Sequence, residues 1–113
     1  MNIPQEQIDE LKTLFPALLA GEEGGTTFFL IPAMELPEGT NPNRVDALLC
    51  PSPRNGYESR LYFSERIQHG GTGTNWNGPV HILGRNWYVY SWRTRAGLRL
   101  AQMISEHLRG LKK

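Results

Sequence analysis

The chain has 113 residues, of which 39% are hydrophobic and 20% charged, and its formal net charge is +1. This length suits one domain, residues 1–113, with a core between two layers of secondary structure, and the composition is that of a globular protein rather than a disordered tail. A net charge so near zero argues against a nucleic-acid-binding protein, which normally has a marked excess of basic residues. We expect a cytoplasmic protein, because no apolar run approaches the roughly 20 residues that cross a bilayer and no signal peptide is visible.

Neither metal nor disulfide chemistry is indicated. The single cysteine, Cys50, cannot form an internal disulfide, as is usual in a reducing compartment. The three histidines, His69, His81 and His107, show no ligand spacing such as a helical i, i+4 pair. We therefore expect no metal and no other cofactor.

The first half of the chain predicts one helix followed by strands. Apolar residues at helical spacing indicate an amphipathic helix over residues 4–15, which ends before Pro16 or continues for one turn to residue 20. Residues 21–25, GEEGG, predict a turn. Three strands are then expected from runs of β-branched, aromatic and alternating apolar residues, at 26–32, 44–50 and 59–67, with a loop at 36–43.

The second half begins with a loop, residues 68–79, which we expect to be flexible because it is rich in glycine, threonine and asparagine. Residues 80–83 and 86–92 are expected to be extended, and apolar spacing predicts a closing helix within 94–113. Aromatic side chains alternate along 87–92, which indicates burial on both faces and hence a central strand or a strand beneath a helix. The order predicts an α+β domain with an antiparallel meander of about four strands and the helices on one face.

This layout, together with several motifs, resembles the bacterial E2-like proteins of ubiquitin-like conjugation operons, which have the fold of ubiquitin-conjugating (UBC) enzymes. The matching segments are LPEG (36–39), VDALLCPSPRNGY and LYFSERI (within 45–67), NWNG (75–78), HILGRNWYVYSW (81–92) and the closing helix. The resemblance implies a UBC-like fold and a carrier that accepts a ubiquitin-like protein from an E1-like enzyme. It further implies a deubiquitinase-like peptidase from the same operon as a partner, and a role in phage defence.

The resemblance also implies where a nucleophile should lie. In the family a His-Pro-Asn segment precedes the nucleophilic cysteine; His81 matches its histidine, whereas Ile82 and Leu83 stand at the other two positions. No cysteine follows residue 51, so the hydroxyl of Ser91 is the candidate that would carry the partner as an oxyester. A serine needs an adjacent base, and His81 is the nearest histidine if a hairpin joins 80–83 to 86–92.

Alternatives remain open at this point. Cys50 is a better nucleophile by chemistry, although a lone cysteine is more often a small buried residue. Ser91 and His81 also fit purely structural roles, in which case the chain would be a catalytically inactive adaptor that binds the ubiquitin-like protein or its E1-like enzyme. The run RNWYVYSW shares features with the aromatic strand of RNA-recognition motifs, but Asn86, Val89 and the order of elements depart from that pattern.

Overall fold

The computed structural model describes residues 3–54, 56–68 and 75–112. Its elements are α1 (Gln5–Leu14), β1 (Leu19–Glu23), β2 (Thr26–Glu35), β3 (Arg44–Cys50), β4 (Arg60–Phe63), β5 (Trp76–Ile82), β6 (Arg85–Tyr90), α2 (Leu100–Arg109) and the 3-10 turn η1 (Gly110–Lys112). The sheet is antiparallel throughout, with strand order β1-β2-β3-β4-β6-β5. The predicted α+β class is confirmed, but six strands replace the expected four or so.

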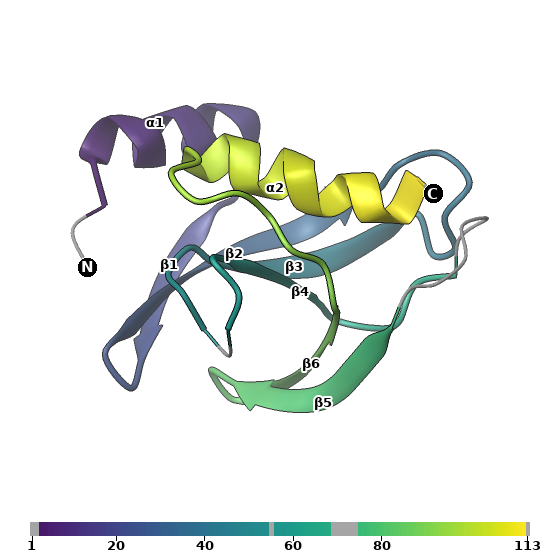
Figure 1. Cartoon of the computed structure of the whole chain (residues 1–113). Coiled ribbons are helices and arrows are strands. Elements are labelled where there is room, and N and C mark those ends of the chain that lie inside the picture. Colours follow the sequence, from purple (N-terminus) through teal and green to yellow (C-terminus); the bar gives the residue numbers. More distant parts are fainter. Residues whose placement is uncertain (1–2, 55, 69–74, 113) are drawn as a thin grey trace.

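Both helices lie on one face of the sheet and contact each other (Figure 1). Helix α1 ends at Leu14, as expected from Pro16, because proline cannot donate the hydrogen bond that would continue it. The alternative of a further helical turn to residue 20 is wrong, since Leu19 and Ala20 already pair with β2. The core beneath the helices is formed by residues from both layers, chiefly Leu11, Phe29, Ile31, Leu49, Leu61, Phe63, Leu100 and Ile104.

A second core lies on the opposite face of the sheet. Here the hairpin of β5 and β6 bends away from the helices and curls beneath the earlier strands (Figure 1), burying Phe28, Leu48, Cys50, Tyr62, Ile82, Trp87 and Val89. The Trp87 Nε1 donates a hydrogen bond to the Ile82 carbonyl at 3.0 Å and so closes the hairpin. Strand β6 has a neighbour on each side, so the expectation of a central strand is confirmed.

Two predicted boundaries change in the middle of the chain. The third predicted strand ends at Phe63 rather than at residue 67. Residues 76–79, predicted as loop, begin β5, where Gly78 and Pro79 fall in an irregularity between Asn77 and Val80. Proline is tolerated there because such a position makes no ladder hydrogen bond. Residues 69–74, the rest of the predicted flexible loop, lie outside the described residues.

Candidate functional site

Ser91 lies directly after β6, at the start of the connection to α2, and its side chain is exposed. Its backbone N–H donates to the Asn75 carbonyl at 2.9 Å, which extends the pairing of Trp76 with Tyr90 by one step. The Ser91 Oγ accepts a hydrogen bond from the Asn77 side-chain amide at 3.3 Å. The hydroxyl is therefore accessible, and an amide donor from the neighbouring strand points at it.

The residues on either side of Ser91 are fixed to α2. The buried Tyr90 hydroxyl donates to the His107 carbonyl, and the Trp92 Nε1 donates to the Glu106 carbonyl at 2.8 Å. Tyr90 also stacks on Phe63 with a ring separation of 6.0 Å. Because side chains alternate along an extended segment, these two inward anchors direct the Ser91 side chain outward.

His81 does not lie beside Ser91, so the expected pair of nucleophile and base is not formed. The register pairs His81 with Asn86 near the turn of the hairpin, while Ser91 follows Tyr90 at the opposite end. Ser91 lies five positions along the extended chain from Asn86, a span of roughly 16 Å at about 3.3 Å per residue. The exposed His81 ring instead hydrogen-bonds through Nδ1 to the Asn86 Oδ1 at 3.2 Å. The hairpin joins the two predicted segments, but its register keeps these two residues apart.

Cys50 is fully buried at the end of β3, within the core beneath the sheet. Its Sγ lies 3.5 Å from the Ser52 carbonyl oxygen and 3.8 Å from the Ser52 hydroxyl. A thiol enclosed in this way is not accessible to an acyl donor. The structure therefore favours the interpretation of Cys50 as a small apolar core residue.

A serine with a histidine partner occurs elsewhere, at a place that sequence reasoning missed. The Ser59 Oγ lies 2.9 Å from the His107 Nε2 and 3.2 Å from the Thr94 Oγ1. Burial lowers the pKa of His107 to about 4, with a smaller contribution from the charge of Arg60. The imidazole is therefore neutral at pH 7, and the same lowered pKa makes it a weak base.

This pair has the contact that an activated serine needs, but it lacks access. Ser59 is only 2% exposed, at the edge of a pocket of about 180 Å³ whose other lining residues include Arg95, Leu98 and Met103. Ser59 and His107 stand 48 positions apart in the sequence. No spacing rule connects residues at that separation, which is why the sequence gives no signal for the pair.

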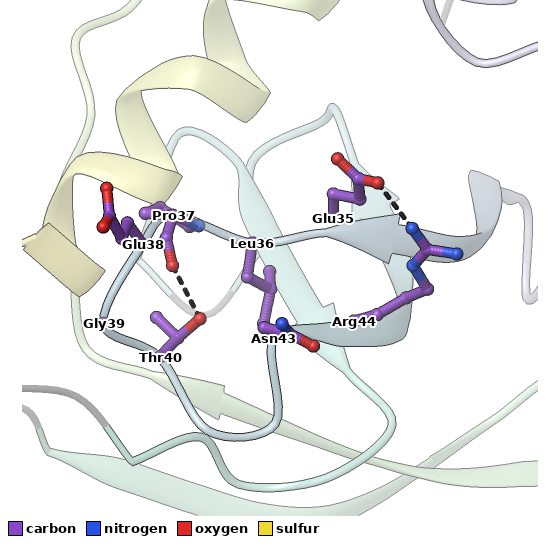
Figure 2. Close-up of a pocket in the computed structure, with 8 residues that line it drawn as sticks. All are labelled: Glu35, Leu36, Pro37, Glu38, Gly39, Thr40, Asn43 and Arg44. Carbon is purple, nitrogen blue, oxygen red and sulfur yellow. Dashed lines mark hydrogen bonds and ion pairs between the residues drawn. The ribbon is translucent and has the colours of Figure 1, made fainter.

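The LPEG segment, residues 36–39, lines a different hollow. Figure 2 shows this pocket, of about 300 Å³, between the end of β2 and the start of β3. An ion pair between Glu35 and Arg44 closes one side, and the Thr40 hydroxyl donates to the Pro37 carbonyl at 2.7 Å. Neither Ser91 nor the pair of Ser59 and His107 belongs to this pocket.

Among the residues that the structure describes, no group of three or more histidine, cysteine, aspartate or glutamate side chains is placed to hold a metal ion. Within the same ranges, no helix is long and apolar enough to cross a membrane. No protein-family model, curated protein or solved structure matches the chain.

Proposed function

We propose that the chain is an E2-like carrier that accepts a bacterial ubiquitin-like protein from an E1-like enzyme as an oxyester on Ser91 and passes it to an amine. The observation that carries this proposal is the presentation of Ser91: an exposed hydroxyl, after the last strand and before the closing helix, held between two anchored aromatic residues. This is the region where the resemblance to the family places a nucleophile.

The Asn77 amide supports the same chemistry. Acyl transfer passes through a tetrahedral intermediate whose oxygen becomes negative, and side-chain amides stabilise such an oxyanion when they are preorganised. The family's asparagine is missing after His81, whereas the Asn77 Nδ2 lies 3.3 Å from the Ser91 Oγ. Asn77 would supply from β5 what the His-Pro-Asn segment supplies in the family once its amide turns from the Ser91 Oγ to the carbonyl oxygen of the bound acyl group, where the oxyanion forms. Replacing it with alanine should slow adduct formation by about 10²-fold.

A second candidate function is a catalytically inactive adaptor that binds the ubiquitin-like protein or its E1-like enzyme. It is favoured by one observation: the described residues that hydrogen-bond to Ser91 are Asn75 and Asn77, and neither can act as a base. A serine hydroxyl without a base is a weak nucleophile at neutral pH. In this case the chain would contribute binding alone.

The deciding experiment combines the protein with a bacterial ubiquitin-like protein, an E1-like enzyme and ATP. A carrier gives an adduct that survives thiol reductant, is cleaved by alkali and is abolished by Ser91→Ala. The matched control is Ser105→Ala, which removes an equally exposed serine from α2 and should leave the adduct unchanged.

An adduct that persists in Ser91→Ala would refute the serine assignment. Its loss with reductant and with Cys50→Ala would identify a thioester instead. No adduct, together with retained binding to either partner in a pull-down, would establish the adaptor.

A further inference from the structure

The charged residues are divided very unevenly along the chain. Residues 1–50 contain two basic and eight acidic side chains, a formal charge of −6, whereas residues 51–113 contain ten basic and three acidic ones, a formal charge of +7. The net charge of +1 hides this separation. Strands β4 to β6, α2 and the connections between them therefore carry most of the arginine.

Several of these arginines have no acidic partner. In the described ranges, ion pairs involve Arg44, Arg85, Arg95, Arg99 and Arg109. The same ranges show no carboxylate within 4.0 Å of Arg54, Arg60, Arg66 or Arg93. Each of these four guanidinium groups lies over an aromatic ring instead.

Two of the four converge on one ring. The guanidinium carbons of Arg60 and Arg93 lie 4.1 and 4.9 Å from the centre of the Tyr57 ring, so they are at most about 9 Å apart. The Arg93 Nη1 donates to the Gly56 carbonyl at 2.9 Å and is exposed. Arg60 is only 7% exposed, and its buried Nη2 has no hydrogen-bond partner among the described residues. Two guanidinium groups and one unsatisfied donor thus lie around one ring, and in the described ranges no carboxylate lies within 4.0 Å of either arginine.

We propose that Arg60, Arg93 and Tyr57 form a binding site for a phosphate-class anion. Buried guanidinium nitrogens are normally paired, and a missing partner in a cationic cluster is the feature that a bound anion would complete. Planar guanidinium groups match the oxygens of phosphate through hydrogen bonds of about 2.8 Å. A doubly charged phosphate balances two arginines, which a single carboxylate does not.

The burial of the Arg60 Nη2 determines how the anion enters. Arg93 is exposed and held by the Gly56 carbonyl and the Tyr57 ring, so its side chain would have to release these two contacts for an anion to reach the Arg60 Nη2. The Tyr57 ring lies against the Arg60 guanidinium, whose carbon is 4.1 Å from the ring centre. The anion site does not depend on the proposed carrier function.

The test is a titration with inorganic phosphate at constant ionic strength, followed by NMR shifts of the arginine Nε–H and the neighbouring amides. Wild-type protein should show saturable binding with a dissociation constant of about 1 mM or tighter, and Arg93→Gln should weaken it at least tenfold. The matched control is Arg66→Gln. Arg66 also lies over a tyrosine, at 5.2 Å from the Tyr88 ring, and lacks an ion pair in the described ranges, so its loss should change binding less than about twofold.

Arg60→Lys provides a second variant, because lysine keeps the positive charge but lacks the planar guanidinium group. It should also weaken phosphate binding at least tenfold. The amide spectrum of this variant shows whether it is folded. Displacement of bound phosphate by a dinucleotide would assign the anion to a nucleic-acid backbone, and no displacement would assign it to free or terminal phosphate. Three results would overturn the proposal. These are no saturation by about 50 mM phosphate, equal losses in Arg93→Gln and Arg66→Gln, and acetate binding as tightly as phosphate.

Discussion

Lowering the pH from about 7 to 4.5 should destabilise the fold by about 2 kcal/mol through His107 alone. His107 is 3% exposed, and burial lowers its pKa from 6.5 to about 4. In the window between these two values, the unfolded chain binds a proton that the folded chain does not. The stabilisation is therefore complete above pH 6.5 and is lost as the pH falls towards 4.

The assay is urea unfolding across this window in wild-type protein and in His107→Gln, which retains a hydrogen-bonding group for Ser59 but cannot be protonated. The variant should be less stable at pH 7, with a much flatter dependence of unfolding free energy on pH. His81→Gln removes an exposed histidine and should keep the wild-type slope. The carboxyl of Asp46 does not interfere: the hydrogen bond from the Ala33 N–H lowers its pKa from 3.8, so its effect falls below this window. Equal slopes in wild type and His107→Gln would refute the reasoning.

Three further substitutions test the packing of the core and one of its buried hydrogen bonds. Gly110→Ala should cost about 1–3 kcal/mol in urea unfolding, because the added Cβ would lie 2.6 Å from the Tyr90 Cε2 and that ring is held on both sides. In Gly21→Ala the added Cβ would lie 3.1 Å from the flexible end of the Leu83 side chain, so the substitution should change stability by less than about 0.5 kcal/mol. Similar losses of stability in both glycine variants would contradict this account. Trp87→Phe should lower the free energy of unfolding by about 1–3 kcal/mol in the same assay, because the buried Ile82 carbonyl loses its hydrogen-bond donor. An unchanged free energy of unfolding would show that a water molecule replaces the indole N–H.

The strands that the sequence predicts well are those that side-chain burial defines. The alternating pattern of residues 44–50 matches the observed β3 at both ends, because that strand lies inside the sheet and its apolar residues reach both cores. Strand β1, LAGEE, was missed because it is an edge strand: its pairing with β2 is made by the backbone, and four of its five side chains are exposed. The sequence predicts a loop at 76–79 because Gly78 and Pro79 normally signal a turn, whereas in the structure they lie in a bulge of β5.

The candidate site was less predictable, for a different reason. The structure leaves Ser91 exposed, but its relation to His81 depends on the register of the hairpin. A shift of register changes every cross-strand neighbour. The contact of Ser59 with His107 depends on how α2 packs against β4, which no local pattern encodes. The separation of charge between the two halves could be counted from the sequence, yet the net charge concealed it.

Two serines in this molecule each have one of the two properties that a nucleophilic serine needs, which are exposure to a substrate and contact with a histidine. Ser91 is exposed and has an amide donor but no base among its described partners, whereas Ser59 has a neutral histidine at 2.9 Å and almost no access. If Ser91 carries an acyl group, its proton must leave to a base from a bound partner or from residues outside the described ranges. The oxyester should then form only within the complex with the E1-like enzyme, and a small activated ester should not acylate Ser91 in the isolated protein. Rapid acylation of Ser91 by such an ester, detected by mass spectrometry and absent in Ser91→Ala, would show that the base belongs to this chain.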